Sequence, residues 1–458
     1  MFKGLIVLAV LATGWVATLW FGVSPDFGHW SLPTLVAAHA LPPLLTGGVW
    51  FGWRRWRNRR AEEQASAAET VAEKERGAVA EEARKLAVAE ERRQRFGCDC
   101  RAVAMAQVLA GEDELRLAET RGGVYFSAFD PSQAELVDGT SVFAHLETGI
   151  REALENVYAH SPVVASLPVF VVPPTQARGD VFLAAVRTIQ SALVEEWGTP
   201  PGGTRELGQV SLLADGRKAL NGLVELFERS PGLSIVLLGS DSPWLHTRLV
   251  SEEDADFGAE SPGQGVFALL LTHPELARAE SDILSHERDA LLSLPVLARL
   301  HRPVSTETGV GRKRATELGR VIGGLMAQAR RNAGLGEATL ADDASGAKKA
   351  DKQGSHPECN WLVHNSGTPA YCGTRMAGVG VALSDHGIEI DPFEEGTNVS
   401  TAVGDLGDAR SVGMLAVAVA KAAATQGAAL CVEFSGDEAL SLFFARAPES
   451  GEATAVSA

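Results

Sequence analysis

The chain has 458 residues, enough for two or three domains of ~150 residues each, and its 45% hydrophobic and 22% charged residues are typical of a globular protein, not a disordered one. Residues 1–60 hold six Lys or Arg and one acid, so residues 61–458 carry a formal charge of −22. Such an acidic surface repels phosphate backbones and excludes nucleic acid as an expected partner. Five cysteines are too few for a disulfide framework and fit a reducing compartment.

Residues 1–60 predict a transmembrane helical hairpin that ends in an Arg cluster. Residues 4–23 carry no charge and are long enough to cross a ~30 Å hydrocarbon core. A second apolar stretch, residues 30–53, contains three prolines and His39, which are tolerated where a neighbouring helix supplies hydrogen-bond partners. The Arg cluster at 54–60 then predicts that both ends of the hairpin, and the soluble body, lie in the cytoplasm.

Two alternatives to the hairpin remain. A cleaved signal peptide would have a shorter apolar region, and no second apolar segment would follow it at once. If only the first segment crossed the membrane, the soluble body would lie outside the cytoplasm, a topology that the Arg cluster disfavours.

Residues 61–95 predict a charged spacer helix. They are almost all Ala, Glu, Arg, Lys, Gln and Val, most of which are strong helix formers, and Glu81 and Lys85 have the spacing of a helical ion pair. A helix of this length would span roughly 50 Å. Its apolar face is mostly Ala, which favours a solvated spacer over a coiled coil.

From residue 96 onward, strand and helix patterns alternate and predict an α/β body with a largely parallel sheet. Strands are expected at 96–104, 163–172, 234–239, 265–271, 361–364, 378–383 and 428–433, and helices at 180–196, 217–229, 275–292, 316–332 and 409–426. Residues 334–357 are rich in Gly, Ala, Asp and Lys, which predicts a flexible loop or linker between an α/β domain at 96–333 and a second at 358–446. Residues 447–458 are expected to form a disordered tail.

The cysteines predict no metal or redox site. Cys98 and Cys100 alternate along a strand, so their thiols share one face, and no second pair follows at a zinc spacing. Cys359 and Cys372 lie near His356 and His364 but match no standard finger. We expect free structural thiols, with no bound metal and no cofactor.

Two further motifs fall short of a catalytic signature. Residues 309–312 (GVGR) hold a lone GxG without a preceding strand, and the chain contains no GxxxxGK[ST] sequence, which excludes a standard P-loop. Ser240 follows a predicted strand, but Pro243 stands where a nucleophile elbow needs Gly. His246 lies three residues further on. A polar strand-to-loop corner is the favoured interpretation.

Three segments resemble parts of the thiolase-like ketoacyl synthases. Residues 262–271 (PGQGVFALLL) resemble the Gly-rich approach and strand that follow the active-site region of those enzymes. Residues 364–368 (HNSGT) resemble their His-Gly-Thr segment. Residues 404–411 (GDLGDARS) resemble their Gly-His-x-Gly-Ala-Ala segment. The resemblance implies a thiolase-like fold and condensation by a Cys nucleophile and two histidines. Asp405 holds the position of the second histidine, and residues 101–358 contain no Cys. An anion there would destabilise a developing negative charge, so we expect a degenerate body and assign no catalytic residue.

The whole layout resembles the membrane-anchored "virulence factor" proteins, which include the type VI secretion lipase adaptors. The likeness rests on the hairpin, the Arg cluster, the charged helix and the α/β body, and within the body on residues 167–174, 266–274 and 404–415. It implies a non-catalytic, inner-membrane-tethered cytoplasmic adaptor that recruits a toxic lipase effector to the secretion spike. The alternative is an enzyme at the membrane face, either a divergent thiolase-like acyltransferase or a serine hydrolase, that uses His364 or His246.

Overall fold

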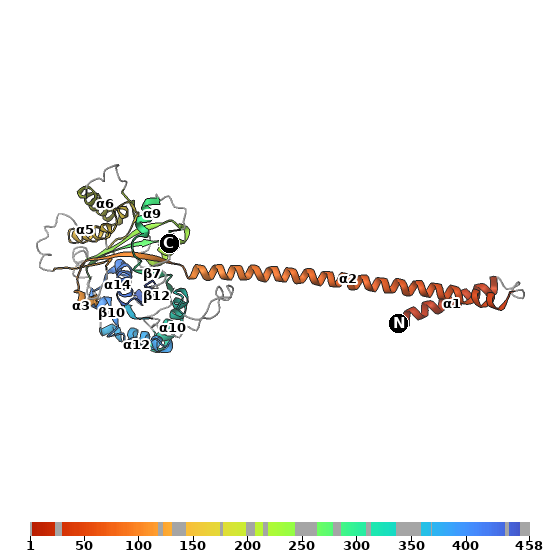
Figure 1. The fold of residues 1–458 in the computed structure, drawn as a ribbon. Coiled ribbons are helices and arrows are strands. Elements are labelled where there is room, and N and C mark those ends of the chain that lie inside the picture. The colour runs from red at the N-terminus through yellow and green to blue at the C-terminus, as the bar shows by residue number, and fades with distance from the viewer. Residues whose placement is uncertain are drawn as a thin grey trace. The chain divides into compact units, whose positions relative to one another are not determined.

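The computed structural model describes residues 2–22, 30–117, 122–130, 143–174, 177–197, 207–213, 219–242, 263–277, 285–307, 313–335, 359–367, 369–435 and 439–448. The chain divides into two compact units, which Figure 1 shows as ribbons. We call Met1–Val88 the N-terminal unit and Ala89–Ala458 the body.

Two helices make up the described part of the N-terminal unit. Helix α1 covers Phe2–Gly22, and helix α2 begins at Leu32 and continues to Gln94. The second apolar segment and the spacer therefore form one helix. Within the described ranges, α2 alone is long and apolar enough to cross a membrane, a criterion that signal sequences and core helices of soluble proteins also meet. A possible membrane helix is thus supported, and the two-span hairpin stays a prediction.

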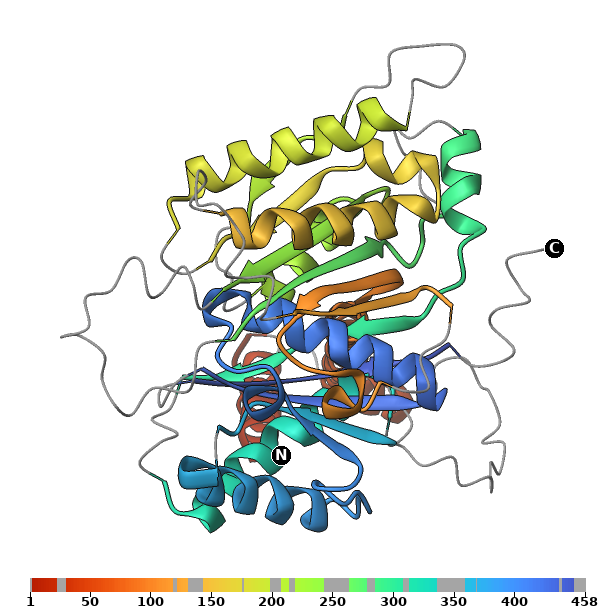
Figure 2. The ribbon, with the colours of Figure 1, turned by 90° about the vertical axis from the view of Figure 1, so that its left-hand side faces the viewer.

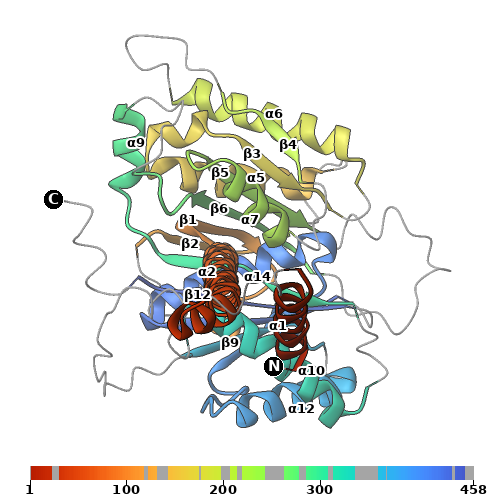
Figure 3. The ribbon, with the colours of Figure 1, turned by 90° about the vertical axis from the view of Figure 1, so that its right-hand side faces the viewer.

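A proline of α2 is matched by a tryptophan of α1. Pro42 has no N–H, so the carbonyl of Ala38, four residues earlier, loses its helical donor. Trp15 Nε1 donates a hydrogen bond to that carbonyl at 2.9 Å. Figures 1 and 3 show α1 beside the first part of α2. The neighbouring helix therefore supplies a partner where the proline removes one.

The body consists of two repeats with the same order of elements. Repeat 1 runs through β1 (Gly97–Val108), α5 (Ala144–Ala159), β3 (Val169–Val172), α6 (Gly179–Glu196), β4 (Val210–Leu212), α7 (Ala219–Arg229), β5 (Ser234–Asp241) and β6 (Gly265–Thr272). Repeat 2 runs through β7 (Ala298–His301) and β8 (Val304–Thr306), α10 (Ala315–Asn332), β9 (Trp361–His364), α12 (Pro369–Asp385), β10 (Gly396–Asn398), α14 (Arg410–Thr425), β11 (Ala428–Ser435) and β12 (Ala439–Arg446). The connections contain α3 (Glu112–Leu115), β2 (Val124–Ala128), η2 (Pro162–Ser166), α9 (Ser285–Leu292), α13 (Val399–Ala402) and η6 (Gly407–Ala409).

The described strands form one sheet in the order β10-β9-β11-β12-β7-β1-β6-β5-β3-β4, with β2 paired to β1 and β8 to β12. Each repeat thus places its strands in the order third, second, fourth, fifth, first. The fifth strand, β6 or β12, is antiparallel to its neighbours, and β1 pairs antiparallel with β7 to join the repeats. The sheet is mixed, which corrects the prediction of a largely parallel one. Only residues 436–438 separate β11 from β12, which is too short for the crossover that a parallel pair needs.

Alternate side chains of the strands enter different hydrophobic cores, because successive residues of a strand face opposite sides of the sheet. On β6, Phe267, Leu269 and Leu271 enter a central core, and the residues between them pack beneath α5 and α6. On β11, Ala429 and Cys431 enter the same central core, and their neighbours pack beneath α10 and α12. The layers are therefore the outer helices of repeat 1, the strands of repeat 1, the central helices, the strands of repeat 2 and the outer helices of repeat 2, as Figure 2 shows.

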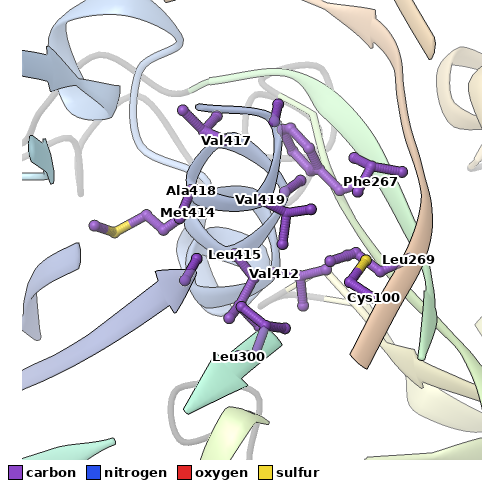
Figure 4. Close-up of a cluster of buried hydrophobic side chains, with 14 of the residues drawn as sticks. Cys100, Phe267, Leu269, Leu300, Val412, Met414, Leu415, Val417, Ala418 and Val419 are labelled. Carbon is purple, nitrogen blue, oxygen red and sulfur yellow. The ribbon is translucent and has the colours of Figure 1, made fainter. Parts of the chain in front are cut away.

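Helix α14 occupies the central core. Residues 411–423 are all buried, and most are Ala or Val, whose small side chains let one helix fit between two sheet faces. A helix that is apolar on every side is expected to be buried on every side. Figure 4 shows Val412, Leu415 and Val419 of α14 near Phe267 and Leu269 of repeat 1.

Several predicted element boundaries are corrected. Residues 378–383 lie within helix α12 instead of a strand, and residues 163–172 divide into η2 and the shorter strand β3. The described part of 275–292 is helical only in α9. Strand pairing also groups residues 298–333 with the second repeat, ahead of the boundary drawn at 334–357. Most of that loop, and residues 449–458, lie outside the described residues.

Candidate functional site

Polar side chains gather where β5, β9 and β11 end and where α14 begins. Both repeats contribute residues to this group. Gly263, just before β6 of repeat 1, donates its backbone N–H to the carbonyl of Asp405 in repeat 2 at 2.7 Å. Carboxyl ends of parallel strands are the usual position of binding sites in α/β proteins. We call this group the strand-end cluster and define it as Ser240, Ser242, Gln264, His364, Asn365, Ser366, Asp405, Arg410, Ser411 and Glu433.

A serine and a histidine form a hydrogen-bonded pair at the end of β9. Ser366 N donates to His364 Nδ1 at 3.4 Å, so Nδ1 is an acceptor and the imidazole proton lies on Nε2. The Ser366 hydroxyl, 2.9 Å from the same nitrogen, is then also a donor to it. Burial lowers the pKa of His364 to about 4, so the ring is neutral at physiological pH. A neutral imidazole that accepts from a hydroxyl has the arrangement of a base and a nucleophile.

The neighbouring asparagine is held by the backbone of β11. Asn365 Nδ2 donates to Phe434 O at 2.8 Å, and Phe434 N donates to Asn365 Oδ1 at 2.7 Å. Arg410 Nη1 donates to the same Phe434 carbonyl at 3.3 Å. Both polar ends of the amide group are therefore bonded to the protein itself.

Asp405 is tied to the start of α14. Its Oδ1 accepts from Gly407 N at 3.0 Å and from Arg410 Nη2. Gly404 and Gly407 have φ values of 93° and 53°, a left-handed conformation that glycine adopts without steric cost. The Asp405 carboxylate is therefore paired with a cation of α14, and its equivalence to the second histidine of ketoacyl synthases stays a prediction from the sequence.

A carboxylate buried in the central layer completes the second-repeat side of the cluster. Glu433 lies on β11 and accepts a hydrogen bond from Ser411 Oγ of α14. Burial raises the pKa of Glu433 to about 7, although this hydrogen bond and the charge of Arg410 act in the opposite direction. Sequence analysis missed this residue. Its signal was a single acid in the otherwise apolar segment AALCVEFS.

The first-repeat side forms a polar corner. Ser242 N donates to Asp241 Oδ1 at 2.8 Å, and Ser242 Oγ donates to Gln264 Oε1 at 3.0 Å. Ser240 lies within β5 and is fully buried, and its hydroxyl has no hydrogen-bond partner among the described residues. This geometry differs from an exposed nucleophile elbow, which needs a sharp turn into a helix. Pro243 and His246 lie outside the described residues.

The described thiols are free and buried. Cys98 and Cys100 both enter the central core, as their alternation predicted. Burial raises the pKa of each described thiol, that of Cys359 to about 12, so these groups are neutral and weakly nucleophilic. The side chain of Cys372 and residues His356 and 309–312 lie outside the described residues. Among the described residues, no three His, Cys, Asp or Glu side chains could hold a metal ion together.

The structure brings together the three segments that resemble ketoacyl synthases. The Gly263 amide contacts the 404–411 segment through Asp405, and Asn365 and Arg410 share the Phe434 carbonyl. Pro262 and Thr368, at the ends of the first two segments, are not described.

The comparisons with known proteins assign neither a family nor an activity to this chain. No family model matches the chain, and no curated protein matches it. Solved structures that match include human mitochondrial 3-ketoacyl-CoA thiolase (TM-score 0.44, 10% identity, 78% of this chain and 100% of that chain). A ketosynthase domain for oxazolomycin from Streptomyces albus has a TM-score of 0.44 at 13% identity, with 78% and 96% of the chains covered.

A third solved structure, 3-oxoacyl-[acyl-carrier-protein] synthase III from Aquifex aeolicus, has a TM-score of 0.40 at 13% identity and covers 76% and 100% of the two chains. All three TM-scores lie below 0.5, so they assign no chemistry to this chain. Its own topology defines a duplicated, mixed α/β protein. The secretion-adaptor family stays a prediction from the sequence.

Proposed function

We propose that this chain is a membrane-tethered binding protein whose body recruits a protein partner and catalyses no acyl transfer. One observation carries the proposal: Asp405 and Asn365, from the two second-repeat segments of the strand-end cluster, are bonded to the protein itself. Asp405 is held by Arg410 and Gly407 N, and both polar ends of Asn365 are held by Phe434. A site for acyl chemistry needs donors directed at a developing oxyanion, and here the donors of Asn365 and Arg410 bond to Phe434 and Asp405.

The chemistry of the described residues supports the same proposal. A condensing site needs a thiolate, and burial keeps the four described cysteines protonated. It also needs a donor where Asp405 stands. Loss of one oxyanion donor typically lowers a rate by ~10²–10³, and an anion in its place should cost at least as much.

The finer proposal concerns the partner and the compartment. The resemblance to lipase adaptors favours a toxic lipase effector and the spike protein of a secretion machine as partners. The Arg cluster at 54–60 favours a body in the cytoplasm, bound to the inner membrane. Alkaline phosphatase, which is active only outside the cytoplasm, should therefore be inactive when fused after residue 100. An active fusion would contradict this topology.

The test is co-purification of the full chain, extracted in mild detergent, from cells that carry the secretion system. We expect a lipase to co-purify in fixed ratio with the wild-type protein and with the His364→Ala and Asp405→Asn variants. Deletion of residues 97–458 should abolish secretion of that lipase and leave the machine assembled. A folded variant that keeps its partner but loses secretion of that partner would contradict a purely binding role.

A second candidate function, a serine hydrolase or acyltransferase, is favoured by the Ser366–His364 hydrogen bond alone. A fluorophosphonate probe distinguishes it from the binding role. Under the binding proposal, the wild-type chain is labelled no more than the Ser366→Ala variant. Labelling that disappears in Ser366→Ala but persists in Ser240→Ala would favour the enzyme, with Ser366 as its nucleophile.

A further inference from the structure

Three tryptophans and three arginines form a ladder on α2, at the end of its apolar segment. The guanidinium carbon of Arg54 lies 5.2 Å from the ring centroid of Trp50, and that of Arg57 lies 5.5 Å from Trp53. Arg60 lies 4.3 Å from Trp56. Each pair has the spacing i, i+4, which brings side chains together on a helix. We call these six residues the Trp–Arg ladder.

The ladder occupies one side of the helix. At ~100° per residue, its six positions fall within an arc of about 160°, and Arg55 and Arg59 fall on the opposite side. The ladder is also open to the surroundings, because Trp53 and Trp56 are 53% and 51% exposed. The side chains of all five arginines from 54 to 60 are exposed. The chain contains no acidic residue between Asp26 and Glu62, so the stretch from 50 to 60 carries five arginines and no acid, and Glu62 and Glu63 follow it.

The contacts with the indole rings leave hydrogen-bond donors of the guanidinium groups available to an anion. An arginine in cation–π contact with a ring is held there without an acidic hydrogen-bond partner, so its N–H donors remain available. Those donors match two oxygens of a phosphate group, which a lysine ammonium could contact only as a point charge. Indole rings prefer the polar boundary of a bilayer, the depth at which lipid phosphates lie. One side of α2 therefore combines an anchor for the boundary with oriented phosphate donors.

We infer that the Trp–Arg ladder is a binding site for the headgroups of anionic phospholipids. The occupant follows from charge complementarity, because three arginines in a stretch with no acid between residues 50 and 60 favour a lipid of net negative charge over a zwitterionic one. The site lies in the N-terminal unit and is independent of the partner proposed for the body. The site would make the attachment of α2 selective for a class of lipid, which the hydrophobic length of the helix alone does not.

The test uses the full-length protein in neutral detergent micelles and counts retained lipid by native mass spectrometry. The probes are dioleoyl phosphatidylglycerol and dioleoyl phosphatidylcholine at equal concentration. The ladder variant is Arg54→Gln/Arg57→Gln, and its matched control is Arg55→Gln/Arg59→Gln, which removes the same charge from the opposite side of the helix. Circular dichroism checks that both variants keep the wild-type helix content. A third variant, Trp50→Leu/Trp53→Leu, keeps every arginine.

We expect the wild-type chain to retain phosphatidylglycerol at least fivefold over phosphatidylcholine. This preference should fall at least fivefold further in the ladder variant than in the matched control, and severalfold in the tryptophan variant. Equal losses in the ladder variant and its control would overturn the site in favour of bulk charge. Equal retention of the two lipids by the wild-type chain would also overturn it. Displacement of phosphatidylglycerol by 10-fold excess inorganic phosphate would identify a free-phosphate site instead of a lipid site.

Discussion

Glu433 shows how one buried carboxyl group makes the stability of the body depend on pH. Its pKa is raised from 4.5 to about 7 by burial, so the folded chain holds this proton more tightly than the unfolded chain does. The contribution of Glu433 to the free energy of unfolding is therefore fully present below pH 4.5 and is lost as the pH rises through about 7. His364, with its pKa lowered to about 4, acts in the opposite sense between pH 4 and 6.5.

We predict that Glu433→Gln matches the wild-type stability near pH 4 and exceeds it above pH 8 by up to about 3 kcal/mol, because one pKa unit corresponds to about 1.36 kcal/mol. Chemical unfolding of both chains across this range measures the difference, in which His364 cancels. In Ser411→Ala, loss of the hydrogen bond to the carboxylate should raise the midpoint of the pH dependence. A wild-type and a Glu433→Gln curve that run parallel from pH 4 to 9 would disprove the buried titration.

A second residue-scale prediction concerns the close approach of the repeats at the strand ends. A Cβ atom on Gly239 would lie 2.8 Å from Val412 Cβ and 2.9 Å from its Cγ2. We predict that Gly239→Ala destabilises the body by about 1–3 kcal/mol, the usual cost of overpacking. Thermal unfolding is the measurement, and the added change Val412→Ala should recover part of the loss. Gly380→Ala is the control, because a Cβ there meets nothing within 4 Å.

The sequence could indicate residues of the site but not their partners. His364 and Asp405 were singled out because segments 364–368 and 404–411 resemble a known pattern, and the structure brings those segments together. The role of Asn365 depends on β11 lying beside β9, a pairing between distant parts of the chain. The role of Glu433 depends on α14 packing against β11. Glu433 in an apolar strand was the one local signal available.

At the scale of elements, the contact between α1 and α2 makes a prediction that a double-mutant cycle can isolate. Trp15 Nε1 donates a hydrogen bond to the carbonyl of Ala38, which Pro42 leaves without a helical donor. Trp15→Phe should destabilise the N-terminal unit in the wild-type chain and much less in Pro42→Ala, where the restored N–H replaces the lost bond. We expect a coupling free energy of about 0.6–1 kcal/mol, as for hydrogen bonds between membrane helices. Unfolding in mixed micelles measures it, and an equal loss in both backgrounds would contradict it.

Helix α12 shows why a local pattern misidentified an element. The sequence Gly378–Leu383 alternates small and apolar residues as a half-buried strand does, yet it lies within a helix. Its buried residues Met376, Val379 and Leu383 have helical spacing, and Gly378 lies against Leu318 of α10. Gly378 permits the two helices to approach closely, whereas a Cβ on Gly380 would meet nothing within 4 Å. Helix α5, by contrast, carries a helical period that the sequence interpretation passed over.

At the scale of the whole molecule, the duplication was not visible in the sequence, because the two repeats share topology and not a residue pattern. The strands β5 and β11 hold equivalent places, but one reads SIVLLGSD and the other AALCVEFS. What the repeats do share is the central core. Val412 and Leu415 of the second repeat pack there with Phe267 and Leu269 of the first. Neither repeat can bury its inner face without the other.

The shared core predicts that the repeats fold only together. Exposure of even five large apolar side chains would cost about 10 kcal/mol at about 2 kcal/mol each, as much as the whole stability of a typical domain. A chain divided between α9 and β7, after residue 294, should therefore give two fragments that are insoluble or bind hydrophobic dyes when expressed alone. Expressed together with different tags, the fragments should co-purify with a single cooperative melting transition. A sharp transition from either fragment alone would show that its sheet and helices suffice, and the central layer would then be an interface between two independent domains.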